Sequence, residues 1–251
     1  MKIVFNELSN PIIQQAVQES PEIEAISADS LEGAAKLLAD GEADGMISGI
    51  DTNSRDIILA ARDLIGVKGA VFSSSFLMEK DGQKIVIGDA AVTKHPDEER
   101  FYEIILQTYE TARLVLDEEP RVVVLSFSTL GSGGKDDTIT LSQNVINRVR
   151  AEHPEILIDG EMQLDAAIVP EVGEKKAPGS VVAGHANVLI CPDLNSGNIL
   201  YKSMERFGGW TAAGPILQGF KKPISDLSRG STVEDVALVI KTMEKIIGGQ
   251  K

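Results

Sequence analysis

The chain of 251 residues has few of the residues that build disulfide frameworks or metal centres. Its single cysteine, Cys191, excludes an intrachain disulfide. Its three histidines are widely spaced, which disfavours a zinc site. Cys191 follows the apolar run Val188–Ile190, so we expect it to be a small core side chain.

Long hydrophobic runs are absent as well. No apolar stretch is long enough to cross a bilayer, and the N-terminal residues lack the apolar segment of a signal peptide. We therefore expect a cytoplasmic protein.

Positive charge is scarce: 24 lysines and arginines face 38 acids, for a net charge of −14. This balance argues against nucleic acid or an anionic membrane as a partner. A small anionic ligand stays compatible, because a few local arginines can outweigh a distant, screened field.

Short apolar strands alternate with amphipathic helical stretches along the whole chain, and 251 residues suffice for one large domain or two modest ones. The strands are expected at Lys2–Phe5, Gly45–Ser48, Arg121–Leu125, Val188–Ile190 and Thr211–Ile216. The helices are expected at Ser30–Leu38, Ser54–Ile65, Glu98–Val115, Asp137–Ala151, Gly197–Phe207 and Val233–Ile247. Such alternation predicts an α/β fold with a mostly parallel sheet covered on both faces.

One segment departs from this alternation. Ala70–Met78 and Lys84–Asp89 are β-rich and are joined by a turn that contains Asp81 and Gly82. We expect an antiparallel hairpin, which marks a second domain, an oligomer surface or a plain extension of the sheet.

A serine- and glycine-rich loop, residues 126–134, follows the strand Arg121–Leu125 and precedes a helix. Backbone N–H groups and hydroxyls at such a place form a natural anion site, although the loop lacks the GK[ST] of a Walker A motif and can be a simple turn. The candidate phosphate or coenzyme contacts are Ser126, Ser128, Thr129, Gly131 and Ser132.

A second polar cluster, Pro192–Asn198, follows the strand Val188–Ile190. Ligands of open α/β sheets bind at that edge, so Asn195 and Asn198 are further candidates. The alternative role is helix capping, for which Asn195 or Ser196 is suited.

The segment Asp226–Gly230 precedes the last helix. Ser231 or Thr232 can cap that helix, with Glu234 or Asp235 completing a capping box. Ser228 and Arg229 are left just before the helix, where an arginine is well placed to hold a phosphate or carboxylate. The alternative is an ion pair between Arg229 and Asp226.

Three acids, Asp159, Glu161 and Asp165, lie close together around Gly160. They are a candidate divalent-metal or acid–base group. The loop lacks the spacing of a calcium site, so structural hydrogen bonding is the favoured interpretation.

Taken together, these segments resemble the phosphate acetyl/butyryl transferase family over about residues 30–251. The matching segments, in family order, are 43–49 (ADGMISG), 126–129, 159–167, 178–187, 192–198, 214–219 and 222–230.

This resemblance implies two α/β/α domains with a cleft between them, in an architecture like that of isocitrate and isopropylmalate dehydrogenases. The first domain would be discontinuous, with residues 1–71 and 218–251, and the second would span 72–217. The implied reaction converts acyl-CoA and phosphate to acyl phosphate and CoA in a ternary complex, without a metal, another cofactor or a covalent intermediate. Family members are usually homodimers.

The family's catalytic residues correspond to Ser228, Arg229 and Asp235. Asp235 would be the base that accepts the proton of the CoA thiol, whose pKa of about 8.5 needs only modest help. Ser228 would donate to the developing oxyanion, and Arg229 would hold phosphate.

Two features depart from the family pattern. We expect the region before 43–49 to be trimmed by roughly 70 residues relative to the family pattern, and Leu59 occupies the expected position of a phosphate-binding arginine. Arg55 and Arg62 lie near the same helix face. Arg55, at the helix start, is our candidate replacement; the alternative is a surface arginine paired with Asp51 or Asp56.

The leading function is therefore a phosphate acyltransferase for acetyl or another short acyl group. A catalytically weak acyl-CoA-binding regulatory module, as in domains fused to malic enzymes, is the second hypothesis and is favoured by Leu59 and the short first region. A dehydrogenase of the same broader fold is disfavoured, because no matching set of metal-binding aspartates is present.

Overall fold

The computed structural model describes residues 1–249, and the chain divides into two compact units. Unit 1 contains Met1–Phe72 and the segment from Gly209 onward, and unit 2 is the continuous segment Ser73–Gly208. Residues 209–217, which the sequence-based boundaries include in the second domain, belong to unit 1. The reason is that the strand at 211–218 pairs with a strand of unit 1.

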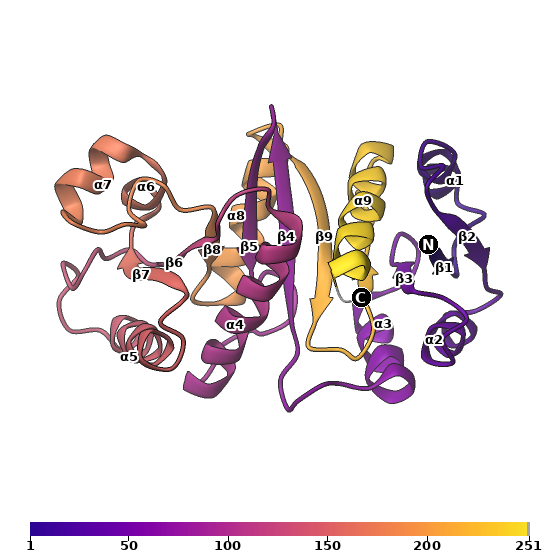
Figure 1. The fold of residues 1–251 in the computed structure, drawn as a ribbon, viewed down its shortest axis with the longest axis horizontal. Coiled ribbons are helices and arrows are strands. Elements are labelled where there is room, and N and C mark those ends of the chain that lie inside the picture. The colour runs from indigo at the N-terminus through magenta and orange to yellow at the C-terminus, as the bar shows by residue number, and fades with distance from the viewer. Residues whose placement is uncertain (250–251) are drawn as a thin grey trace. The chain divides into compact units, whose positions relative to one another are not determined.

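Unit 1 is built on a mixed sheet in the order β2-β1-β3-β10-β9 (Figure 1). Neighbouring strands run parallel except for β9, which is antiparallel to β10. The strands are β1 (Lys2–Phe5), β2 (Glu24–Ser27), β3 (Gly45–Ser48), β9 (Thr211–Gln218) and β10 (Ile224–Asp226). The helices are α1 (Pro11–Gln18), α2 (Leu31–Ala39), α3 (Ser54–Ala60), its π-helical continuation η1 (Ala61–Ile65), and α9 (Val233–Gly249).

Unit 2 has its own mixed sheet in the order β4-β5-β8-β6-β7. Only the β4–β5 pair is antiparallel. The strands are β4 (Ser73–Lys80), β5 (Gln83–Gly88), β6 (Arg121–Leu125), β7 (Leu157–Met162) and β8 (Val188–Ile190). The helices are α4 (Glu98–Val115), α5 (Asp137–Glu152), α6 (Leu164–Ile168), α7 (Pro170–Lys176) and α8 (Leu194–Arg206).

Buried runs explain why these strands form. Every residue of β3 and β8 is buried, and β6 is buried apart from Arg121. Strands covered on both faces read as continuous apolar runs, which is the pattern that predicted them. The α/β fold is therefore confirmed.

The expected hairpin is confirmed as the β4–β5 pair, with a turn of only Asp81 and Gly82. Both turn residues have positive φ, 51° and 79°, as a type I′ turn requires. Because β5 also pairs with β8, the hairpin is an extension of the sheet of unit 2.

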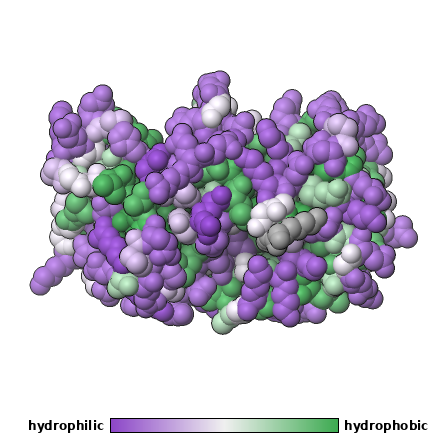
Figure 2. Space-filling model, viewed as in Figure 1, coloured by the Kyte–Doolittle hydropathy of each residue, from purple (hydrophilic) through white to green (hydrophobic). Residues whose placement is uncertain are grey.

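Polar side chains dominate the face of the molecule in Figure 2, and hydrophobic ones form separate small groups there. Within residues 1–249, no helix combines the length and the apolar character that a membrane span requires.

Candidate active site

The loop between β10 and α9 carries Ser228 and Arg229, two of the three predicted catalytic residues, and it is folded tightly by its own hydrogen bonds. The Ser228 N–H donates to Ser231 Oγ (3.1 Å), and the Ser231 N–H donates to the Ser228 carbonyl (2.9 Å). Ser228 Oγ accepts from the Gly230 N–H (3.3 Å). Ser228 is half-buried and Arg229 is exposed, so both can reach a ligand.

Asp235 is buried and fixed at the start of α9. Its Oδ1 accepts from the Ala212 N–H of β9 (3.0 Å), and its Oδ2 accepts from the Thr232 N–H (2.9 Å) and hydroxyl (3.0 Å). The Asp235 N–H donates back to Thr232 Oγ1 (3.2 Å). The capping box therefore uses Thr232 and Asp235, one of the pairs that the sequence left open.

Arg229 donates through Nη2 to Asn53 Oδ1, a residue 176 positions away in the sequence. Asn53 precedes α3, but its side chain makes no capping hydrogen bond there. Arg229 therefore contacts Asn53 and forms no ion pair with Asp226 among the described residues, although that pair was the alternative considered from the sequence.

Asp226, at the end of β10, is a buried carboxyl group with 1% exposure. Burial raises the pKa of Asp226 to about 7, and the negative charge of Glu7 raises it as well. The hydrogen bond with Ser54 and the positive charge of Arg229 lower this pKa but do not outweigh the burial. Its Oδ1 atom has no hydrogen-bond partner among the described residues. Such a group changes charge near neutral pH.

The three helix residues considered for the missing phosphate contact differ in their surroundings. Leu59 is half-buried, and Arg62 forms an ion pair with Asp63 (2.8 Å). Arg55 is exposed and has no ion pair within residues 1–249, so the pairing with Asp51 or Asp56 is not formed. Of the two arginines, Arg55 is the one available to an anion.

Glu7, which the sequence analysis did not select, organises the loop between β3 and α3. Its buried carboxylate accepts from the N–H groups of Gly49 (2.9 Å), Ile50 (3.0 Å) and Asp51 (3.1 Å), and from the Thr52 hydroxyl. The available signal was an acidic residue two positions after the apolar strand Lys2–Phe5, at the sheet edge where ligands bind.

In unit 2, the serine- and glycine-rich loop is organised by Glu161. This carboxylate is fully buried and accepts from Ser128 Oγ (2.7 Å), the Gly131 N–H (2.7 Å) and Gln143 Nε2 (3.0 Å). A carboxylate of the protein itself thus occupies the position expected for an external anion.

The other candidate side chains of this loop also serve it internally. Ser126 Oγ accepts from the Ser128 N–H (3.1 Å), Ser132 Oγ accepts from the Thr129 N–H (2.9 Å), and Thr129 Oγ1 accepts from the Gln163 N–H (3.1 Å). Ser128 and Thr129 are buried, whereas Ser126 is half-buried and Ser132 is exposed.

The cluster at 192–198 caps a helix one turn earlier than expected. Asp193, not Asn195 or Ser196, is the N-cap of α8, and Asp193 and Ser196 form a capping box (Ser196 N to Asp193 Oδ1, 2.8 Å). Asn195 is exposed, and Asn198 donates to the Ala90 carbonyl (3.4 Å). Capping thus uses the aspartate and leaves Asn195 without that role.

The acids at 159–165 have separate structural partners. Arg150 donates to Asp159 (2.6 Å), Lys176 donates to Asp165 (2.8 Å), and Glu161 holds the loop described above. No group of three His, Cys, Asp or Glu side chains within residues 1–249 is arranged to hold a metal ion.

Cys191 is buried as expected, and burial, with the charges of Asp193 and Asp89, raises its pKa to about 12.

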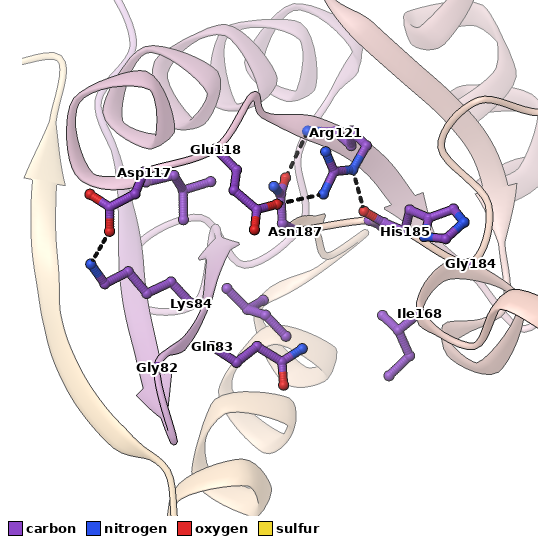
Figure 3. Close-up of a pocket in the computed structure, with 13 residues that line it drawn as sticks. Gly82, Gln83, Lys84, Asp117, Glu118, Arg121, Ile168, Gly184, His185 and Asn187 are labelled. Atoms are coloured by element: carbon purple, nitrogen blue, oxygen red, sulfur yellow. Dashed lines mark hydrogen bonds and ion pairs between the residues drawn. The ribbon is translucent and has the colours of Figure 1, made fainter.

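A cavity of about 250 Å³ lies at the amino ends of β5, β6 and β8, and it is lined by none of the loop residues described above (Figure 3). Its cationic groups already have acidic partners: Lys84 Nζ lies 2.5 Å from Asp117 Oδ2, and Arg121 Nη2 lies 3.0 Å from Glu118 Oε2. The charges of this cavity are therefore balanced within the chain.

Comparison with known proteins points to a single family. The family model for phosphate acetyl/butaryl transferases matches residues 4–243. The phosphate acetyltransferase of Bacillus subtilis (strain 168) is 42% identical over 202 residues, which are 80% of this chain and 62% of that protein. The phosphate acetyltransferase of Treponema pallidum (strain Nichols) is 40% identical over 218 residues, 83% of this chain and 65% of that protein.

Among solved structures, a phosphotransacetylase from Streptococcus pyogenes superposes with a TM-score of 0.87 at 31% identity, covering 99% of this chain and 94% of that one. The chain spans less than two thirds of the length of the two curated relatives. The matched family model, the sequence identity and the shared structure show that this chain belongs to the phosphate acetyl/butaryl transferase family.

Proposed function

We propose that this protein is a phosphate acyltransferase that converts acetyl-CoA, or another short acyl-CoA, and phosphate to acyl phosphate and CoA. The observation that carries the proposal is the β10–α9 loop, which presents Ser228 and Arg229 beside a buried, fixed Asp235. These are the residue types that the transfer needs: a proton acceptor, a hydrogen-bond donor and a phosphate-binding cation.

Asp235 is the proposed base for the CoA thiol. A carboxylate offers about four acceptor positions. Three are used by the Ala212 N–H, the Thr232 N–H and the Thr232 hydroxyl. The remaining position is the one proposed to accept the thiol proton while the other contacts hold the group in place.

Phosphate is proposed to bind Arg229 and Arg55, with Ser228 donating to the developing oxyanion. Both arginines are exposed, and Asn53 holds one Nη atom of Arg229. The planar guanidinium keeps its other N–H groups for an anion. Arg55 then supplies the charge that Leu59 lacks.

In unit 2, the proposed coenzyme contacts are divided by exposure. Ser126, Ser132, Asn195 and Asn198 are exposed or half-exposed and are proposed to touch CoA. Ser128, Thr129 and Gly131 already bond within the loop or to Glu161, so their proposed role is to shape it.

The proposal extends to the architecture and assembly that the family resemblance implies. Unit 1 and unit 2 each have a mixed sheet with helices, in keeping with two α/β/α domains of the isocitrate/isopropylmalate dehydrogenase type. We propose a cytoplasmic homodimer that uses CoA as a substrate and needs no metal or other cofactor.

The test is to mix the protein with acetyl-CoA and phosphate and to follow thiol release. Asp235→Asn should lower kcat about a hundredfold or more, because the general base is lost. Glu234→Gln is the matched control, since Glu234 is its exposed neighbour in the first turn of α9. Both variants should unfold at a midpoint close to that of the wild type, which would show that they are folded. Equal rates for wild type and Asp235→Asn would refute the role of Asp235.

The alternative is a catalytically weak acyl-CoA-binding regulatory module. Leu59 in place of the arginine favours it, and Arg62 is tied to Asp63. CoA binding without any thiol release by the wild type would select this alternative.

A further inference from the structure

We propose that Glu7 is a positioning residue for phosphate binding: its carboxylate folds the loop 49–52 so that Asn53 holds Arg229. The proposal rests on the proposed function, in which Arg229 binds phosphate. Glu7 itself touches no reacting group and acts through the loop.

The contacts of Glu7 account for the shape of that loop. Oε2 accepts from the N–H groups of Gly49 and Ile50, and Oε1 accepts from the Asp51 N–H and the Thr52 hydroxyl. Successive N–H groups that converge on one point form a nest for an anion. If a neutral side chain replaced the Glu7 carboxylate, the nest would lose its charge-assisted hydrogen bonds, which are about twice as strong as neutral ones.

The neighbouring side chains reinforce the same loop. Asn6 Nδ2 donates to Thr52 Oγ1 (3.2 Å), and Asn10 Nδ2 donates to Asp51 Oδ2 (3.0 Å). The segment after β1 therefore forms four hydrogen bonds with residues 51 and 52, and Asn53 follows them directly.

The loop is also packed against the segment that leads to Arg229. A Cβ atom on Gly49 would lie 2.2 Å from Asp226 Oδ1 and 2.6 Å from the Leu227 nitrogen. The Leu227 N–H donates to the Ser48 carbonyl (2.5 Å). A shift of the loop 49–52 is thereby passed to both ends of the Arg229 contact: to Asn53 on one side and to Asp226 and Leu227 on the other.

The experiment compares Glu7→Gln with Glu22→Gln, the same chemical change at an exposed site of unit 1. Glu7→Gln should raise the KM for phosphate about tenfold or more, because small misplacements of a binding group are costly. The KM for acetyl-CoA should change less than about twofold, because only the phosphate-binding side chain is misplaced. Glu22→Gln should have the KM values of the wild type for both substrates.

A structural readout accompanies the kinetics. The NMR signal of the Arg229 Nε–H, assigned with Arg229→Lys, should move or broaden in Glu7→Gln and in Asn53→Ala, and should stay unchanged in Glu22→Gln. A folded Glu7→Gln protein with an unaltered Arg229 signal and an unaltered phosphate KM overturns the proposal. So does a fall in kcat alone with both KM values unchanged, which is the signature of a reduced fraction of folded enzyme.

The same variants and measurements also decide two further cases. If Glu7→Gln does not fold, Thr52→Val removes one of the four donors to Glu7, and a raised phosphate KM supports the proposal while an unchanged one refutes it. If the wild type releases no thiol, the proposed function fails, and the Arg229 signal alone then decides whether Glu7 positions that side chain.

Discussion

At the level of single residues, three buried carboxylates each accept one or more backbone N–H groups at the carboxyl end of a strand. Glu7 binds the loop after β3, and Glu161 binds the loop after β6. Asp89, after β5, accepts from the N–H groups of Ala91, Val92 and Thr93 (2.9–3.2 Å). Loops that would otherwise be open anion sites are thereby held rigid by acids of the protein itself.

Asp226 differs from these three, because it is buried without accepting backbone N–H groups from residues 1–249. Its raised pKa predicts that the stability of the protein depends on pH. The folded protein keeps a proton on Asp226 up to about pH 7, whereas the ordinary pKa is 3.8. Between these values the folded state binds more protons than the unfolded chain, so the free energy of unfolding decreases as pH rises. The loss from this group amounts to up to about 4 kcal/mol.

Urea unfolding of Asp226→Asn at a series of pH values from about 4 to about 8 tests this expectation. The substitution imitates the protonated acid, so the pH dependence that comes from Asp226 should disappear. The free energy of unfolding of the variant should rise relative to that of the wild type at the alkaline end of the series. Asp29→Asn, an exposed control in unit 1, should keep the wild-type slope. Parallel curves for wild type and Asp226→Asn would contradict the assignment.

At the level of elements, the fit of helix α8 against the loop after β5 depends on Gly197. A Cβ atom there would lie 2.5 Å from the Asp89 carbonyl oxygen and 3.1 Å from the Ala90 Cα atom. Gly197→Ala should therefore lower the free energy of unfolding by about 1–3 kcal/mol, the usual cost of overpacking.

Gly248→Ala is the matched control in α9. Beyond its own helix, no atom of residues 1–249 lies within 4 Å of the Cβ position at Gly248, so alanine should be neutral or should stabilise by up to about 1 kcal/mol through its helix propensity. Urea unfolding of the two variants measures the contrast. Equal free energies for both would show that the close approach at Gly197 is not a constraint.

Which elements could be predicted depended on the length and regularity of their apolar patterns. The strands Lys2–Phe5, Gly45–Ser48, Arg121–Leu125 and Val188–Ile190 and the helix Glu98–Val115 have the predicted boundaries. Six elements were not predicted from the sequence: α1, β2, β7, α6, α7 and β10. β7 is interrupted by Asp159 and Gly160, and β10 has only three residues, so neither shows a run long enough to recognise.

At the level of the whole molecule, the net charge of −14 has a consequence for stability. Like charges repel more strongly in the compact state than in the expanded chain. Raising the ionic strength from about 0.01 to about 0.15 M shortens the Debye length from about 30 to about 8 Å. The thermal midpoint should therefore rise with potassium chloride.

Differential scanning calorimetry in a phosphate-free buffer measures this shift without a substrate anion. A neutral solute of equal osmolarity serves as the reference. A midpoint that stays constant or falls over this range of potassium chloride would show that self-repulsion does not limit the stability of this chain.

Short contiguous patterns were enough to predict the alternation of strands and helices, the family resemblance and the candidates Ser228, Arg229 and Asp235. The contacts of those residues could be known only from the folded chain. The Asn53 contact of Arg229, the Ala212 contact of Asp235 and the nest around Glu7 each join residues from different elements. The physical reason is that a hydrogen bond depends on positions within about 3 Å, and folding brings distant residues to that range.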